Sequence, residues 1–430
     1  MITTAFINIW NKRIGAIAWD VDTELASFEF ESSFLTNKWD LSPLKMPIEG
    51  AERRVFSFSE LRGTTTFKGL PGLLADVLPD KYGNSLINAW LSRNGRPTDS
   101  MNPVELLCFI GKRGMGALEF EPIVPKTNNG ATKIELDSLI NIAQEILSGR
   151  QDFNTNLSSG EAKAMSDILK IGSSAGGARA KAVIAFNPDT KEIRSGQADS
   201  PKGFTHWLLK FDGVTDQQLG ISSGYGRVEM AYHLMAKEAG IEMTECRLLE
   251  ENGRAHFMTR RFDREHGKGK LHVQSFCAMA HYDFNEVTSF SYEQLFETMR
   301  RLLLPYTDAE QLYRRMVFNV MARNCDDHTK NFSFRMDKTS QWKLAPAFDI
   351  CHSYRPGSTW VSQHSLSING KRLNITRDDL MKVAKNMNIK KADTIINQVN
   401  AVVSRWNDFA AQTNVKADLR DAVGKTLLLL

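Results

Sequence analysis

Short stretches of alternating apolar and polar residues mark the first part of the chain, and such alternation is typical of half-buried strands. They lie at 6–10 and 28–30. Beyond them the pattern predicts a helix over 84–91 and another after Pro103, because proline suits the first turn of a helix. The segment 122–132 is rich in Pro, Asn and Gly, which favours a domain boundary there.

Behind this boundary the pattern divides into a strand-rich part and a helical part. Helices are predicted at 136–147 and at 228–239, the second of which ends at Gly240, a common stop residue. An apolar strand is predicted at 182–186, and further strands are predicted at 206–211, 246–249 and 256–260. From about Ser275 onward the pattern is mostly helical, apart from a hairpin-like stretch between Asn331 and Leu344.

These elements predict an α+β protein in which a two-lobed body follows a small α/β N-terminal domain. The expected divisions are an N-terminal domain, a strand-rich N-lobe and a helical C-lobe, at 1–125, 126–262 and 263–430.

Composition narrows the class of protein. Of the 430 residues, 42% are hydrophobic and 24% are charged, which excludes a largely disordered or fibrous chain. No apolar run approaches the ~18 residues of a membrane span, and no basic residue precedes the first apolar stretch, as it would in a signal peptide. We therefore expect a cytoplasmic protein with no membrane partner.

Charge and cysteine usage add two further constraints. The net charge of +4 permits contact with nucleic acid but does not indicate it. Five cysteines, with no C-x-x-C pair in a long chain, argue against a disulfide framework or a structural zinc site. The expected state is reduced, mostly buried thiols.

The segment Asn324–Phe332 carries the most specific chemical pattern. Asp326 and Asn331 have the D-x-x-x-x-N spacing of a kinase catalytic loop, in which the Asp accepts the substrate's hydroxyl proton and the Asn holds Mg²⁺. A predicted strand, turn and strand then lead to Asp349, where a kinase places a second metal-binding carboxylate, and Mg²⁺ prefers such oxygen ligands. A solvated loop stays open as an alternative. So does a metallohydrolase site built from Asp326, Asp327, His328 and Asp349.

Three stretches upstream could serve a nucleotide. Gly172–Lys181 is rich in small residues that let backbone N–H groups approach phosphates, although it is not a Walker A loop and a flexible linker would look similar. Lys210 lies among apolar strand residues and needs a partner, for which Glu229 in the following helix is a candidate. The alternative is an edge-strand lysine that faces solvent. The stretch 256–264 lies where a kinase hinge would hold adenine, unless it is an ordinary arginine-rich strand.

Taken together, these stretches resemble the HipA family of bacterial toxins, which are serine/threonine protein kinases with an atypical kinase fold. The resemblance spans nearly the whole chain. The matching segments are Leu78–Asn84, with Lys81 in place of the usual Gly, and Ser173–Lys181, Thr259–Arg264, Asp326–Asn331 and Leu344–Asp349.

The resemblance implies a role for each motif residue. Asp326 would be the catalytic base, and Asn331 and Asp349 would bind Mg²⁺. The residues implied in ATP binding are Ser173, Ser174, Ala175, Gly176, Gly177, Ala178, Lys181, Lys210, Arg260, Phe262, His328, Lys330 and Asn331. Two departures are visible: Arg260 stands where the family often has Glu, and Asp349 is followed by Ile350-Cys351 rather than Phe-Gly.

The resemblance also implies regulation and partners. Ser174 matches the loop serine whose autophosphorylation silences the kinase. The implied partner is a dimeric helix-turn-helix antitoxin of the HipB type, through which the chain would meet operator DNA. The implied substrate is an aminoacyl-tRNA synthetase, whose phosphorylation stalls translation and makes cells dormant and persistent. A catalytically silent corepressor subunit and a small-molecule kinase of the aminoglycoside or choline type are the alternatives.

Overall fold

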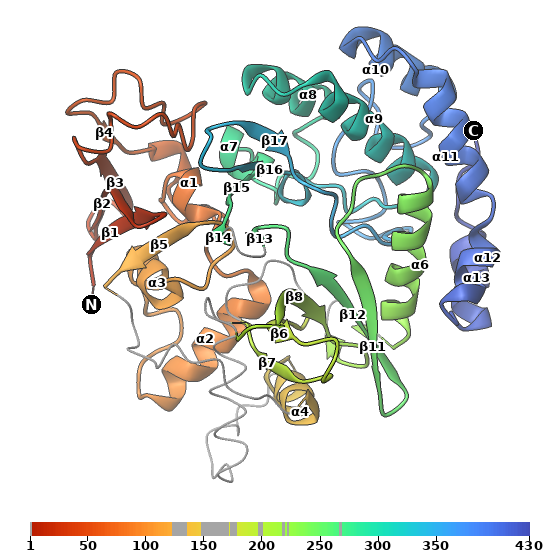
Figure 1. The fold of residues 1–430 in the computed structure, drawn as a ribbon, viewed down its shortest axis with the longest axis horizontal. Coiled ribbons are helices and arrows are strands. Elements are labelled where there is room, and N and C mark those ends of the chain that lie inside the picture. The colour runs from red at the N-terminus through yellow and green to blue at the C-terminus, as the bar shows by residue number, and fades with distance from the viewer. Residues whose placement is uncertain are drawn as a thin grey trace. The chain divides into compact units, whose positions relative to one another are not determined.

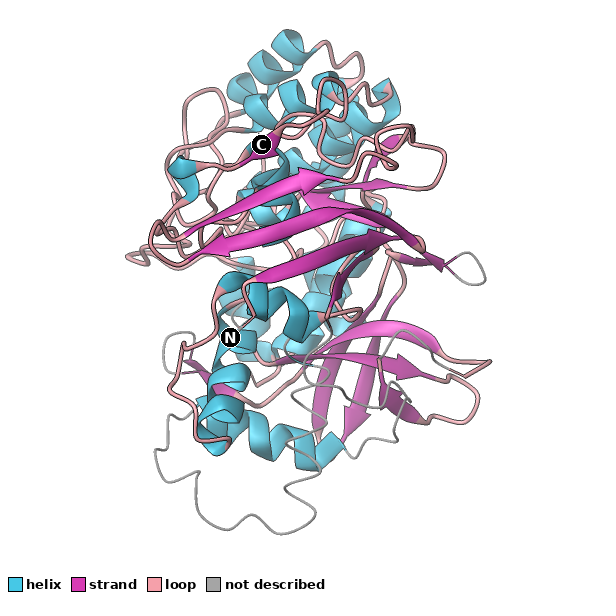
Figure 2. Cartoon of the chain, turned by 90° about the vertical axis from the view of Figure 1, so that its left-hand side faces the viewer, coloured by secondary structure: helices cyan, strands magenta, loops and turns pink. Residues whose placement is uncertain are grey.

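The computed structural model describes residues 2–122, 136–147, 172, 179–196, 201–216, 220–221, 223–265 and 269–430. The chain forms two compact units, each assembled from separate stretches. Unit 1 comprises Met1–Lys38, Ile48–Gly226 and Arg247–His272, and unit 2 comprises Trp39–Pro47, Arg227–Cys246 and Val273–Leu430. The predicted α+β class is confirmed, because antiparallel sheets and helices occur together (Figures 1 and 2).

The N-terminal part of unit 1 is built on a five-stranded antiparallel sheet of order β4-β3-β2-β1-β5. Its strands are β1 (Thr4–Ile9), β2 (Lys12–Asp20), β3 (Leu25–Phe30), β4 (Val55–Phe56) and β5 (Leu118–Glu121). Ile7, Ile9 and Phe28 are fully buried, as the alternating pattern predicts for one face of a sheet. The strands predicted at 6–10 and 28–30 are confirmed.

Helix α3 (Pro103–Ile110) contacts β1, β2 and β5 of this sheet. The other helices of this part are η1 (Ser59–Leu61), α1 (Gly72–Ala75) and α2 (Lys81–Arg93), and α4 (Leu136–Leu147), further along the chain, contacts α2. The helix predicted over 84–91 begins earlier, because the Asp80 carboxylate accepts a hydrogen bond from the Gly83 N–H and caps the first turn of α2. Helix α3 begins at Pro103 as predicted, and Asn102 caps it.

A second five-stranded antiparallel sheet in unit 1 has the order β11-β12-β8-β6-β7. Its strands are β6 (Lys181–Phe186), β7 (Ile193–Ser195), β8 (Thr205–Lys210), β11 (Cys246–Glu251) and β12 (Arg254–Arg260), which confirms the predicted strands. Two short pairs complete the unit, β9 (Thr215–Asp216) with β10 (Gly220–Ile221) and β13 (Arg264–Glu265) with β14 (Gly269–Lys270). Every residue of β6 is buried, so this strand lies in the core.

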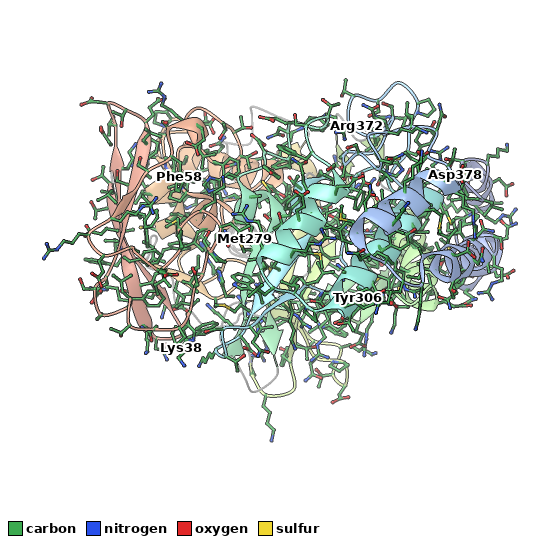
Figure 3. The ribbon with its side chains drawn as sticks, turned by 90° about the horizontal axis from the view of Figure 1, so that it is seen from above. Lys38, Phe58, Met279, Tyr306, Arg372 and Asp378 are labelled. Atoms are coloured by element: carbon green, nitrogen blue, oxygen red, sulfur yellow. The ribbon has the colours of Figure 1, made fainter. Side chains whose placement is uncertain are left out.

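Unit 2 is mostly helical, as the pattern predicts. Its helices are α6 (Tyr225–Glu238, which starts at the end of unit 1), α7 (Phe276–Ala280), α8 (Tyr292–Arg301), α9 (Tyr306–Met321), η3 (Thr329–Asn331), α10 (Arg377–Met387), α11 (Ala392–Val403), α12 (Trp406–Gln412) and α13 (Ala417–Gly424). A small sheet of order β15-β16-β17 joins β15 (His272–Ser275) to the predicted hairpin, β16 (Ser333–Met336) and β17 (Trp342–Leu344). Met279 on α7 lies in the core, whereas Tyr306 at the start of α9 is exposed (Figure 3).

Within the described ranges, no helix combines the length and the apolar character that crossing a bilayer requires. All five cysteines are free thiols, and four of them are buried.

Candidate functional site

The loop between α9 and β16 carries four of the predicted site residues, Asp326, His328, Lys330 and Asn331. Asn331 donates its side-chain Nδ2 to the backbone oxygen of Asp326 at 2.7 Å, which closes the loop on itself. His328 Nε2 lies 3.8 Å from Asp326 Oδ1, and the Asp326 side chain is 44% exposed. His328 and Lys330 both lie against the ring of Phe284, with the His328 ring centroid 5.2 Å and the Lys330 Nζ 5.4 Å from it. The carboxylate of Asp326 is therefore open to solvent.

Asp327, the next residue, points into the core instead. It is 1% exposed, and its carboxylate accepts hydrogen bonds from the Tyr292 hydroxyl at 2.8 Å and from the Ser365 N–H at 2.8 Å. His364 Nδ1 lies 2.9 Å from the same carboxylate. Tyr292 is itself held by Asn319, whose Nδ2 donates to the hydroxyl at 3.0 Å. Three groups therefore hold Asp327 in place, and this fixes the backbone that carries Asp326.

The charge state of this cluster follows from its burial. Burial by itself lowers the pKa of His364, but the neighbouring Asp327 carboxylate outweighs it and raises that pKa to about 10. Burial and the same carboxylate raise the pKa of Tyr292 well above its ordinary value. A neutral tyrosine and a charged imidazole therefore surround Asp327 at neutral pH.

The loop is also fixed on its other flank. The Cys325 N–H donates to the Ser353 oxygen at 3.1 Å, and the Ser365 hydroxyl donates to the Cys325 oxygen at 3.2 Å. Arg372 (Figure 3) donates to the backbone oxygens of residues 364 and 365 and, at 2.9 Å, to that of Phe290. The stretch 364–372 therefore supports the catalytic-loop candidate.

Asp349 follows β17 in unit 2. The segment before it is held by Arg315, which donates to the Ala345 oxygen at 2.8 Å, and by the Ala347 N–H, which donates to the Glu242 oxygen at 2.8 Å. Asp349 has a left-handed backbone with a φ of 56° and is half-buried. Among the residues that the structure describes, no three His, Cys, Asp or Glu side chains group as metal ligands. The metallohydrolase alternative also loses Asp327, because its carboxylate is committed to the core.

The lysine predicted to meet phosphate lies at the end of a central strand. Lys210 is the last residue of β8, which lies between β12 and β6. The edge-strand alternative is therefore wrong. Lys210 stands opposite Phe257 of β12 and Lys181 of β6. Glu229 lies on α6 in unit 2 and is 7% exposed. Its pairing with Lys210 stays a prediction.

The central part of the glycine-rich motif, residues 173–178, lies outside the described residues. It contains the predicted ATP contacts Ser173, Ser174, Ala175, Gly176, Gly177 and Ala178. Both ends of the motif are described, and both are buried. Lys181 is 2% exposed, and its Nζ lies 3.5 Å from Asp80 Oδ2.

The stretch predicted as a hinge begins at the end of β12. Arg260 closes that strand and is half-buried, and Phe262 is 8% exposed. Asp263, which follows Phe262, is fully buried, and its carboxylate accepts hydrogen bonds from Arg261 Nη2 at 2.7 Å, from Arg264 Nη1 and from the Gly116 N–H at 2.8 Å.

Arg261, Asp263 and Arg264, called the hinge cluster below, are also hydrogen-bonded to the loop before β5. Arg261 and Arg264 both donate to the Gly114 oxygen, at 3.1 and 3.0 Å. Burial alone would raise the pKa of Asp263, but the two guanidinium groups hold it below its usual range. The predicted hinge stretch is thus bound to the N-terminal part of unit 1 by a buried ionic cluster.

Family models cover most of the chain. The HipA-like C-terminal domain matches residues 173–406, and the HipA N-terminal domain matches residues 5–121. The chain belongs to the HipA family. The resemblance read from the sequence motifs is confirmed.

Two individual likenesses agree with this membership. "Putative kinase Y4mE" of Sinorhizobium fredii is 26% identical over 152 residues, a stretch that spans 33% of this HipA-family chain and 33% of that relative. The chain of a Shewanella oneidensis HipA, HipB and operator DNA complex matches with a TM-score of 0.69 at 16% identity, over 98% of this chain and 94% of that one. The second likeness shows a shared fold.

A third likeness is much weaker. The Helicobacter pylori proinflammatory kinase CtkA matches 58% of this chain and 92% of its own, at 12% identity and a TM-score of 0.33.

Several residues that shape the site in this HipA-family chain escape the sequence patterns. Asp327 is held, directly or through Tyr292, by residues from distant parts of the sequence, namely Tyr292, Asn319 and His364. The backbone of Gly114 and Gly116 is hydrogen-bonded to Arg261 and Asp263. No spacing rule links these positions. The nearest local signal is the pair of adjacent acidic residues, Asp326 and Asp327, which does not by itself distinguish the exposed carboxylate from the buried one.

Proposed function

We propose that this HipA-family chain is a Mg²⁺- and ATP-dependent serine/threonine protein kinase that acts as the toxin of a toxin–antitoxin system. The observation that carries the proposal is the arrangement of the 324–332 loop. Asp326 is the accessible carboxylate of the loop, and Asn331 is bonded to its backbone. Because positioning and charge account for most of phosphoryl-transfer catalysis, a base held this firmly suits the reaction.

The residues fit a divalent metal. Asn331 engages its amide nitrogen with Asp326, which leaves the amide oxygen as the atom that can serve as a ligand. Together with the Asp349 carboxylate it supplies the hard oxygen donors that Mg²⁺ prefers. When bound, Mg²⁺ offsets the negative charge of the phosphate groups.

The chain's own residues divide the remaining work. Asp326 accepts the proton of the substrate hydroxyl as that oxygen bonds to the γ-phosphorus and the bond from phosphorus to the ADP oxygen breaks. Lys210 offers its ammonium group to the phosphates, and the backbone around Arg260 and Phe262 holds adenine. His328 and Lys330, in the same loop of unit 2 as Asp326, are further proposed ATP contacts.

The remaining parts of the proposal concern partners and control. Autophosphorylation of Ser174 would add about −1.5 to −2 charges beside the nucleotide and switch the kinase off. A HipB-like helix-turn-helix antitoxin dimer is the proposed partner, and it carries the chain to operator DNA, by analogy with the Shewanella complex of HipA, HipB and operator DNA. The proposed substrate is an aminoacyl-tRNA synthetase in the cytoplasm, whose modification stalls translation and favours persistence.

Transfer of radiolabelled phosphate from ATP tests the proposal. Wild-type protein should label itself or a protein substrate, and Asp326→Asn should lower the rate at least ~10²-fold. Glu297→Gln, an exposed carboxylate change on α8, is the matched control and should keep the wild-type rate. A wild-type protein that transfers no label and still represses through an antitoxin would establish the silent corepressor instead. Phosphoproteomics after induced expression would identify the substrate.

A further inference from the structure

Helix α2 of the N-terminal domain and its N-cap residue Asp80 contact the two described ends of the glycine-rich motif. At the first end, Gly172 is packed so closely that an added Cβ would lie 2.5 Å from Leu86 Cδ1 and 3.3 Å from Tyr82 Cε1. Leu86 and Tyr82 are both buried residues of α2. Only glycine fits this contact without displacing the helix side chains.

At the other end, an ion pair joins β6 to the start of α2. Lys181 is the first residue of β6, and its ammonium group lies 3.5 Å from Asp80, whose side chain is 8% exposed. Asp80 also caps α2 through the Gly83 N–H at 2.9 Å, so its carboxylate is fixed in direction. A lysine that is 2% exposed requires a counter-charge, and Asp80 supplies one.

The register of the sheet adds a reason for this pairing. Lys181 on β6 stands directly opposite Lys210 on β8. Residues opposite each other in antiparallel strands share a face, and like charges there repel. Neutralising Lys181 with Asp80 lets both lysines stay in register.

We propose that Asp80 is a positioning residue, which acts through Lys181 to hold β6 and the ends of the glycine-rich motif against the N-terminal domain. In this arrangement Lys181 is an anchor rather than the phosphate ligand implied by the sequence resemblance, and Lys210 is the lysine that meets phosphate. The proposal rests on the proposed function, because the position it controls is that of a bound nucleotide.

A double-mutant cycle separates an anchor from a ligand. Asp80→Asn removes the charge but keeps a good helix cap, and Lys181→Met removes the ammonium group. Each change should raise the KM for ATP about tenfold with a smaller change in kcat, because misplacement by about 1 Å is costly. The KM for ATP of the double variant should be no higher than that of either single variant. Unchanged KM in Asp80→Asn beside a raised KM in Lys181→Met would overturn the proposal, because Lys181 would then act without Asp80.

A matched control tests whether the effect is merely structural. Glu105 is a buried carboxylate that pairs with Arg96 at 2.7 Å inside the same domain, away from the motif. Glu105→Gln should lower thermal stability with no change in KM. A KM that rises equally in Glu105→Gln and Asp80→Asn would overturn the proposal. Should Lys181→Met fail to fold, the KM of Asp80→Asn alone decides, because an unchanged KM in that variant would overturn the proposal.

A readout that is independent of activity keeps this proposal distinct from the proposed function. Amide hydrogen exchange along β6 should be faster in Asp80→Asn than in Glu105→Gln, whether or not the protein binds ATP. Equal exchange in the two variants would overturn the anchor. Failure of the wild-type protein to bind a fluorescent ATP analogue would instead overturn the proposed function and leave the exchange result standing.

Discussion

Two buried carboxylates, Asp327 and Asp263, lie beside the proposed base and the proposed hinge. Different kinds of group surround each of them. In unit 2, Asp327 beside the proposed base is surrounded by a hydroxyl, a backbone N–H and the imidazole of His364. In unit 1, Asp263 beside the proposed hinge is surrounded by a backbone N–H and the guanidinium groups of Arg261 and Arg264. Imidazole can release its proton, whereas guanidinium keeps its charge in proteins.

This difference predicts which of the two clusters can adjust its charge when a partner is lost. A broken partnership at Asp327 can be relieved by a change of protonation, but a broken partnership at Asp263 leaves permanent charges in the core. The same chemical change should therefore cost more in unit 1 than in unit 2, and a rise in pH above neutrality should act on unit 2 first.

The largest effect is expected from Asp263→Asn. The change leaves Arg261 and Arg264 buried without their counter-charge, which should cost about 3–5 kcal/mol of unfolding free energy. Urea unfolding of the full chain measures it. A loss below about 1 kcal/mol would contradict the view that this cluster joins the hinge to the N-terminal domain.

A smaller stability loss is expected from Asp327→Asn. Without the carboxylate, His364 becomes neutral, so the cost falls to about 1–3 kcal/mol for the hydrogen bonds that are weakened. The phosphate-transfer rate should nevertheless fall at least ~10-fold, because Asp326 loses its rigid support. A larger loss of unfolding free energy in Asp327→Asn than in Asp263→Asn would contradict the predicted difference between the two clusters.

The pH dependence of stability should separate the two clusters. The pKa of His364 is raised to about 10 in the folded chain, whereas an unfolded imidazole titrates near ~6.5. The stability that this pair contributes is therefore complete below about pH 6.5 and is lost as the pH rises towards 10. Unfolding at a series of pH values should show this decline in wild type and a flatter profile in His364→Gln; parallel profiles would contradict it.

The Asp263 carboxylate should be silent over the same range. Its pKa is lowered in the folded chain, so its contribution is present above the unfolded value of ~3.9 and is lost only as the pH falls further. The acid limb of the same pH series tests this direction.

The smallest effect is expected from Tyr292→Phe, which removes one hydrogen bond to Asp327 and should cost about 1 kcal/mol. Tyr313→Phe is the matched control, because its buried hydroxyl donates to the Leu380 oxygen at 3.0 Å in the same unit. Both variants should lose similar stability in urea, but only Tyr292→Phe should lower kcat. Equal kcat in the two variants would show that Tyr292 has no part in holding the loop.

The sequence predicts what depends on neighbouring residues. Alternation locates the strands, Pro103 locates a helix start, and the Asp326–Asn331 spacing locates the loop whose side chains do lie together. What it misses depends on tertiary structure. His364 meets Asp327 from a distant segment, and the partner of Lys181 is Asp80, about a hundred positions earlier.

The sequence also leaves two local features imprecise, and each has a physical reason. The predicted start of α2 is too late because the pattern of apolar residues begins after the cap that Asp80 supplies. Whether Lys210 lies at an edge is decided by sheet order, and no single strand's sequence encodes that order.

The short excursion Trp39–Pro47 has a consequence for how such chains can be recombined. It lies between β3 and β4 in sequence, yet it is part of unit 2, where Trp39 Nε1 donates to the Lys338 oxygen at 2.9 Å and Trp342 Nε1 donates to the Asp40 oxygen at 3.2 Å. A gene split between the two family domains would strip unit 2 of this segment and uncover the turn of the β16–β17 hairpin. Swapping N-terminal modules between relatives should therefore succeed only when the hairpin is exchanged with them.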